Sequence, residues 1–94
     1  MAAVDLKVAF GEVIRELRLA AGLSQERLSL ECGRHRTFVS LIERGKNAPS
    51  ITTLWVLSES LGVTPSDVIH QVERRLAVGT GRSQTRRRTT KRKS

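Results

Sequence analysis

Phe, Trp, Tyr and Cys are scarce in this sequence, and it has no long apolar segment. Phe10, Phe38 and Trp55 are its only aromatic residues of these types, so the interior must be built from aliphatic side chains. The single cysteine, Cys32, excludes an internal disulfide and, with only two histidines, cannot complete a zinc site. No stretch approaches the roughly 18–20 apolar residues of a transmembrane helix. We therefore expect no metal, no cofactor and no membrane contact, in a reducing, cytoplasmic compartment.

The features of an enzyme are also missing. A chain of 94 residues forms at most one small domain. Such a domain buries only about 60–65% of its unfolded surface, which leaves little room for a deep catalytic cavity. The sequence contains no paired carboxylates in a plausible cleft, no His/Cys nucleophile pair and no phosphate-binding loop. These absences favour a binding protein over an enzyme.

Acidic residues are absent from the C-terminal end of the chain. Residues 82–94, RSQTRRRTTKRKS, contain seven Lys/Arg and no acid, whereas residues 1–81 contain ten Lys/Arg and all nine acids. The net charge of +8 is therefore divided into +7 for the tail and +1 for the rest. Without apolar side chains the tail cannot offset its ordering entropy, so we predict a domain over residues 1–79 and a disordered basic tail over residues 80–94. Contact with a polyanion is its expected role, with solubility as the alternative.

Apolar residues elsewhere repeat every three or four positions, which is the period of amphipathic helices. Glycines and capping residues divide the repeats, and no alternating strand pattern of useful length appears. The sequence thus predicts an all-α class with helices over residues 5–21, 25–32, 36–44, 51–61 and 65–78. The last helix has the clearest start signal, with Thr64 as N-cap, Pro65 at the first position and Asp67 at the third. Its inner face is expected to hold Val68, Ile69, Val72 and Leu76.

The second and third predicted helices are short and are joined by a glycine-containing turn, CGRH, as in a helix-turn-helix motif. The segments LSQERL, CGRHRTFVSLIERG, APSITTL and ESLGV resemble the lambda-repressor/Cro-type (Xre-like) helix-turn-helix family over about residues 10–70. HRTFVSLIERG is most similar to the controller proteins of restriction–modification systems. Two positions depart from the family pattern, because Ser29 replaces a usual alanine and Arg34 a usual small aliphatic residue. The resemblance implies a compact five-helix DNA-binding domain.

The same resemblance implies which side chains contact DNA. Arg36 and Thr37 match positions that reach base edges in the major groove, where arginine pairs with guanine O6 and N7 and threonine donates a hydrogen bond or packs its methyl on thymine. Ser40 is a further expected base contact, and His35 either contacts a base or phosphate or simply begins the helix. The expected phosphate contacts, which set the register on the duplex, are Gln25, Arg34, Lys46 and Asn47.

Two further sets of residues are expected to organise the domain. Arg18 and Glu43 correspond to a family ion pair that ties the first helix to the recognition helix and fixes its orientation. Family domains commonly dimerise through the region of the fourth and fifth helices. Trp55 lies off the face formed by Leu54, Leu57 and Leu61, so we expect it to anchor a dimer interface, with burial under the fifth helix as the alternative. Val68 and Val72 are predicted to lie in the same interface.

These features predict a sequence-specific transcriptional regulator, such as a repressor, that binds a palindromic operator in double-stranded DNA as a homodimer. RNA polymerase is a further candidate partner, and the expected location is cytoplasmic and nucleoid-associated. A controller protein, a phage-type repressor and an antitoxin all remain open within this class. The alternative from another class is a nonspecific nucleic-acid-binding or architectural protein driven by the basic tail. The nearly neutral domain argues against that alternative.

Overall fold

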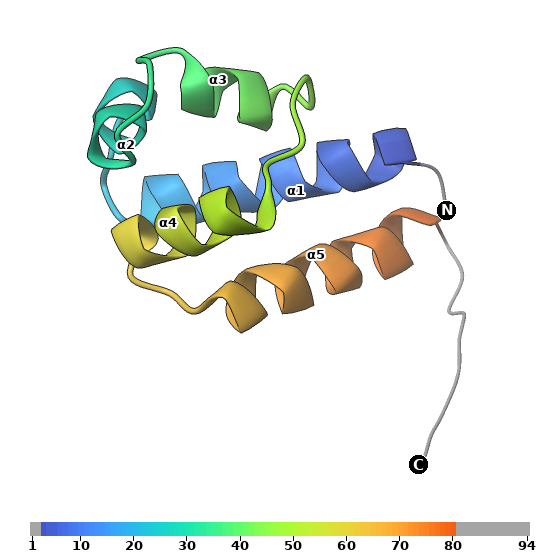
Figure 1. The fold of residues 1–94 in the computed structure, drawn as a ribbon. Coiled ribbons are helices and arrows are strands. Elements are labelled where there is room, and N and C mark those ends of the chain that lie inside the picture. The colour runs from blue at the N-terminus through green and yellow to red at the C-terminus, as the bar shows by residue number, and fades with distance from the viewer. Residues whose placement is uncertain (1–2, 81–94) are drawn as a thin grey trace.

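The computed structural model describes residues 3–80, and these residues form five α-helices without a strand (Figure 1). The helices are α1 (Ala3–Ala20), α2 (Gln25–Glu31), α3 (Phe38–Glu43), α4 (Ile51–Leu61) and α5 (Pro65–Thr80). The predicted all-α class with five helices is confirmed. α5 continues two residues past its predicted end at residue 78, and the basic tail at residues 82–94 lies outside the described residues.

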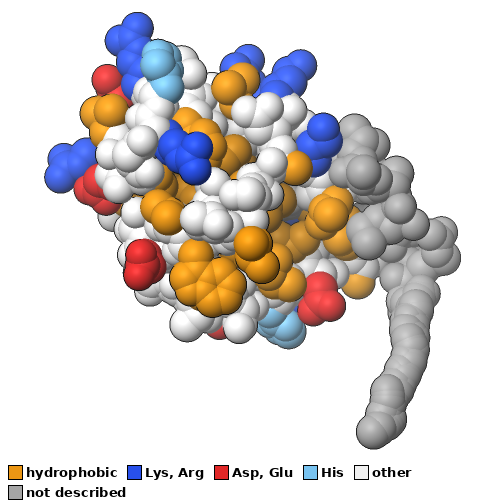
Figure 2. Space-filling view, in the orientation of Figure 1, with side chains coloured by type: hydrophobic (Ala, Val, Ile, Leu, Met, Phe, Trp, Pro, Cys, Tyr) orange, Lys and Arg blue, Asp and Glu red, His pale blue; other side chains and the backbone are white. Residues whose placement is uncertain are grey.

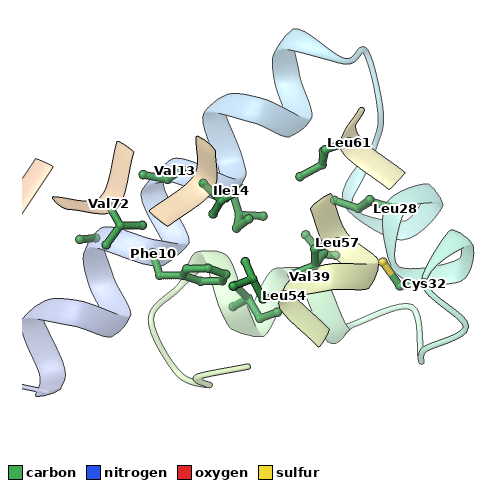
Figure 3. Packing of buried hydrophobic residues seen from close by; sticks show 13 residues of the cluster. Phe10, Val13, Ile14, Leu28, Cys32, Val39, Leu54, Leu57, Leu61 and Val72 are labelled. Atoms are coloured by element: carbon green, nitrogen blue, oxygen red, sulfur yellow. The ribbon is translucent and has the colours of Figure 1, made fainter. Parts of the chain in front are cut away.

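α1 is the central element of the domain. It packs against α3 on one side and against α5 on the other, while α2 contacts both α3 and α4 (Figure 1). Every helix contributes to a single cluster of buried apolar side chains, shown from close by in Figure 3. As the scarcity of aromatic residues required, Phe10 is the one aromatic member of this cluster, which otherwise consists of Ala9, Val13, Ile14, Leu28, Cys32, Val39, Ile42, Leu54, Leu57, Leu61, Val68 and Val72.

Local capping sets most helix ends where the sequence predicts them. The Ser50 hydroxyl accepts a hydrogen bond from the Thr53 backbone N–H at 3.1 Å, which begins α4. At the start of α5, the Thr64 hydroxyl accepts from the Asp67 N–H at 3.0 Å, and the Asp67 carboxylate accepts from the Thr64 N–H at 3.5 Å. Gly62 ends α4 in the left-handed region at φ 76°, a conformation that other residues rarely adopt.

One predicted core position on α5 is wrong. Val68 and Val72 are buried as predicted and Leu76 packs against the cluster, but the Ile69 side chain is 45% exposed. At about 100° per residue, Ile69 lies at the edge of the face centred on Val72, where it lines a surface groove and is not covered by the core. Ile69 therefore belongs to the outer surface of the domain.

Candidate nucleic-acid interface

The helix expected to contact DNA begins later than predicted. Regular α3 starts at Phe38, whereas the sequence predicted a start at His35 or its neighbour. The Phe38 N–H donates to the His35 carbonyl at 2.9 Å, so Arg36 and Thr37 form a turn that leads into the helix. This turn places both side chains at the outer end of α3, where both residues are exposed. Figure 2 shows Lys, Arg and His side chains along this edge of the molecule, over α2 and α3.

His35 caps this turn with its side chain. The Thr37 backbone N–H donates to the His35 Nδ1 at 3.2 Å, and the Thr37 Oγ1 lies 2.9 Å from the same nitrogen. A side-chain acceptor that bonds the backbone N–H two residues further on closes a local turn, and this turn ends at Thr37, the N-cap residue of α3. His35 therefore does more than begin the helix, because its ring holds Thr37.

Two other predicted base contacts, Arg36 and Ser40, differ in their exposure and in their hydrogen bonds within the protein. Arg36 makes no hydrogen bond or ion pair with any residue in the described part of the chain, so its guanidinium is available to an outside ligand. Ser40 is only half-exposed, and its backbone carbonyl accepts a hydrogen bond from Arg44 Nε at 3.3 Å. The freest donor at this end of α3 is thus Arg36.

Three of the four predicted phosphate contacts line one groove of about 480 Å³ between the α3–α4 loop, α4 and the first turns of α1. Lys46 and Asn47 are exposed in the loop. Arg34 donates to the Thr53 hydroxyl at 3.1 Å, and its guanidinium carbon lies 5.2 Å from the centroid of the Phe38 ring. Lys7 lines the same groove. Sequence reasoning missed Lys7 because no pattern in the neighbouring residues shows that the α3–α4 loop packs beside the start of α1.

Gln25, the fourth predicted phosphate contact, is held by an ion pair beneath the interface. Arg18 Nε donates to Glu43 Oε2 at 2.6 Å and Arg18 Nη2 to Glu43 Oε1 at 3.1 Å, with side chains only 8% and 3% exposed. Gln25 Nε2 donates to the same Glu43 Oε1 at 2.8 Å, and Arg18 Nη1 to the Leu23 carbonyl at 2.8 Å. The structure therefore brings Arg18 and Glu43 together, and this network joins α1, the start of α2 and the end of α3.

A buried serine fixes the other end of α3. The Ser29 hydroxyl donates to the Gln25 carbonyl at 2.8 Å and accepts from the Val39 N–H at 3.0 Å. Because Val39 is in the first turn of α3, its N–H has no acceptor within the helix. The hydroxyl at this position, where the resembling family usually has alanine, therefore satisfies a buried donor and fixes α2 to α3.

The backbones of α1 and α3 approach closely at Gly11. A Cβ added there would overlap the Ile42 carbonyl oxygen and lie 3.0 Å from the Glu43 carbonyl oxygen. A side chain at residue 11 would therefore force the C-terminal end of α3 away from α1. Together with the Arg18–Glu43 pair, this contact sets how far α3 stands out from the core.

The predicted dimer residues divide into one that is exposed and two that are not. Trp55 is 55% exposed, so its burial under the fifth helix, the alternative considered, is wrong. Val68 and Val72 are 0% and 3% exposed, and their prediction as interface residues is corrected because both side chains are used within the protomer. Ile51, one turn before Trp55 on α4, is 71% exposed, and Ile69 on α5, which lines a groove together with Ile51, is 45% exposed. Figure 2 shows apolar side chains gathered over α4 and α5 on the side that faces the viewer.

Residues 3–80 contain neither a cluster of metal-ligating side chains nor a helix able to span a membrane. No three His, Cys, Asp or Glu side chains are grouped so that they could hold a metal ion in this part of the chain. None of its helices combines the length and the apolar character required to span a bilayer. Cys32 is buried with its Sγ 3.8 Å from the Ser60 hydroxyl, and burial raises the pKa of the thiol, so Cys32 is a core residue with little thiolate character.

Comparison with known proteins identifies the class. Residues 14–68 match the model of a family described as Helix-turn-helix. The chain belongs to this family of DNA-binding transcription regulators, with α2 and α3 as the two motif helices.

Several relatives share a narrower description. The chain is 39% identical over 66 residues to control protein C.BamHI of Bacillus amyloliquefaciens, which covers 69% of this chain and 82% of the relative. It is 35% identical over 71 residues to control protein C.MunI of a Mycoplasma species, covering 74% and 96%. Among solved structures, the restriction–modification controller protein C.AhdI of Aeromonas hydrophila superposes with a TM-score of 0.68 at 35% identity, covering 72% of this chain and 99% of that one.

Proposed function

We propose that this protein is a controller of a restriction–modification system that binds a palindromic operator as a homodimer. The observation that carries the proposal is the capped turn at the start of α3, where Arg36 and Thr37 are exposed and Arg36 has no partner among the described residues. Similarity to three control or controller proteins supports the biological role. The proposed role requires occupancy of DNA and no chemistry.

The proposed contacts divide by function. Arg36, Thr37 and Ser40 read bases in the major groove, while the basic groove with Arg34, Lys46 and Asn47, together with Gln25, contacts the phosphate backbone. A two-fold dimer through the exposed apolar residues of α4 and α5 would place the two copies of α3 about 34 Å apart, one turn of B-DNA. Two-fold symmetry in the protein then requires a palindromic site.

The defining experiment selects bound sequences from random duplex DNA with the full-length protein. Enrichment of one palindrome is expected, whereas similar affinity for all sequences would support the nonspecific alternative driven by the basic tail. Location of the enriched site next to restriction and methylase genes would support the controller role. Its location beside phage genes or a toxin gene would favour a phage-type repressor or an antitoxin.

Replacing Arg36 by alanine should weaken operator binding by roughly 1–3 kcal/mol and relax preference at one base pair in each half-site. Binding to random DNA should change much less, because a base contact is lost and the phosphate contacts remain. Fluorescence anisotropy with both duplexes measures the two affinities. Arg74→Ala is the matched control, since Arg74 is an exposed arginine on α5, away from α3. Equal losses on both duplexes would reassign Arg36 to a phosphate contact.

Trp55→Ala should weaken dimerisation by about 2 kcal/mol or more, because large aromatic side chains near the centre of an interface supply much of its affinity. Sedimentation equilibrium measures the change, and unchanged circular dichroism would show that the fold is kept. Leu19→Ala is the matched control, since Leu19 is an apolar residue with the same 55% exposure on α1. A wild-type protein that stays monomeric at tens of micromolar, with or without DNA, would contradict the proposed assembly.

A further inference from the structure

We propose that His35 fixes the direction of the Thr37 hydrogen bond, so that Thr37 recognises an amino group on a base edge, adenine N6 or cytosine N4. The inference rests on the proposed function and specifies the base chemistry that this position reads. Sequence alone left Thr37 either to donate to a base or to pack its methyl on thymine. The geometry of the turn points to a different role, in which the Thr37 oxygen accepts.

The argument begins with the proton on the imidazole. A backbone N–H is only a donor, and the Thr37 N–H points at His35 Nδ1 from 3.2 Å. Nδ1 must therefore be an acceptor without a proton, and the neutral ring carries its proton on Nε2. His35 is exposed, and its ring has no hydrogen-bond partner other than Thr37 among the described residues, so no neighbour there favours the opposite tautomer.

The Thr37 hydroxyl follows from that assignment. Its oxygen lies 2.9 Å from the same Nδ1, and an acceptor nitrogen can hold it only if the hydroxyl donates, so the single lone pair of Nδ1 is shared by the Thr37 N–H and hydroxyl. The single hydroxyl proton is then directed at His35. The remaining lone pairs of the Thr37 oxygen are available outside the protein, so an external ligand meets an acceptor and not a donor.

This direction selects among base edges. In the major groove, adenine N6 and cytosine N4 carry amino groups, while guanine O6 and N7 and thymine O4 are acceptors. The Thr37 oxygen, as an acceptor, can take a hydrogen bond from either amino group. Opposite a guanine or thymine acceptor atom, it would face a second acceptor with no proton between the two. Arg36, the preceding residue, is purely a donor. The two adjacent side chains would therefore read opposite chemistry, Arg36 an acceptor edge and Thr37 a donor edge.

The test uses the full-length protein and the selected operator with single base analogues in one half-site. Thr37→Val, which keeps the shape but lacks the hydroxyl, first identifies the base pair whose preference depends on Thr37. There the base is replaced by an analogue without its amino group, which is purine in place of adenine or 2-pyrimidinone in place of cytosine. In a separate duplex, the purine is replaced by its 7-deaza analogue, which lacks the N7 acceptor. Loss of the amino group should weaken wild-type binding about three- to tenfold, the size of one hydrogen bond.

Substitutions at His35 test the positioning role. In His35→Asn, the carbonyl Oδ1 occupies the place of Nδ1 and accepts the same two hydrogen bonds, so the penalty for amino removal should be kept. In His35→Ala the Thr37 hydroxyl is free to rotate and can also donate to an acceptor edge, so the penalty for amino removal should be smaller than in the wild type. A purely structural cap would lower affinity for all duplexes equally in His35→Ala, and the ratio between normal and analogue duplexes would not change.

Several results would overturn the inference. One is a Thr37-dependent loss on the 7-deaza duplex with no loss on amino removal, which would make Thr37 a donor. Another is a Thr37→Val protein with unchanged base preference at every position, which would remove Thr37 from base reading. In both cases a palindrome would still be enriched and the proposed function would stand. Failure to enrich any sequence would instead overturn the proposed function, and the inference with it.

Discussion

Replacing Glu43 by alanine is expected to lower the free energy of unfolding by about 3–5 kcal/mol, because one partner of a buried ion pair is lost. The Arg18 side chain is only 8% exposed and would keep its charge without the carboxylate that accepts from Nε and Nη2. Gln25 Nε2 would also lose its acceptor. Urea denaturation followed by circular dichroism measures the change, which is large for a domain of this size.

A double variant separates the pair from its surroundings. Arg18→Met combined with Glu43→Leu removes both charges and keeps apolar volume, so it should be much more stable than Glu43→Ala alone. Its operator affinity should nevertheless fall, because nothing then directs Gln25 or fixes the end of α3. A Glu43→Ala protein within about 0.5 kcal/mol of the wild type, the range of ordinary surface substitutions, would show that the pair is not structural.

The second large effect is expected at Gly11. In an open helix position, Gly→Ala stabilises by about 1 kcal/mol through helix propensity. At residue 11 the new Cβ would overlap the Ile42 carbonyl oxygen, and overpacking of this kind costs about 1–3 kcal/mol or more. Because the obstruction is backbone and not a flexible side chain, we expect the steric cost to exceed the propensity gain. Thermal and urea denaturation should show a net loss of stability.

Gly11→Ala should also reduce operator binding at temperatures where the variant is still folded, since relief of the overlap displaces α3. Arg15→Ala, at an exposed position of the same helix, is the control and should stay within about 0.5 kcal/mol of the wild type. A Gly11→Ala protein as stable as the wild type and with the same operator affinity would mean that α1 and α3 can separate at little cost.

The sequence predicted those parts of the fold that depend on nearby residues. The start of α4 follows from the Ser50 cap, and the start of α5 follows from the reciprocal bonds of Thr64 and Asp67. In both cases the bonded residues are three positions apart in the sequence. The start of α3 was predicted too early because Arg36 and Thr37 form a turn held by the His35 ring, and the helix begins only after Thr37. A pattern of caps cannot show which unusual acceptor the folded turn will use.

Features that depend on tertiary contacts were harder to predict. The Arg18–Glu43 pair came from the family resemblance, because a separation of 25 residues carries no local signal. Val68 and Val72 were expected both in the core and at an interface, and their burial within the protomer decides for the core. Lys7 and Gly11 were overlooked because their importance arises from the return of the α3–α4 loop and of α3 onto α1.

The Ser29 hydroxyl has a consequence for engineering new specificity into this scaffold. An exchange of residues 35–43 with the corresponding segment of a relative would move the Val39 N–H but leave its acceptor behind on α2. The donor and acceptor lie on different helices, so the natural unit of exchange is the continuous segment 25–43. A library that varies Arg36 and Thr37 while it keeps Ser29 constant would preserve this connection and confine the diversity to the surface.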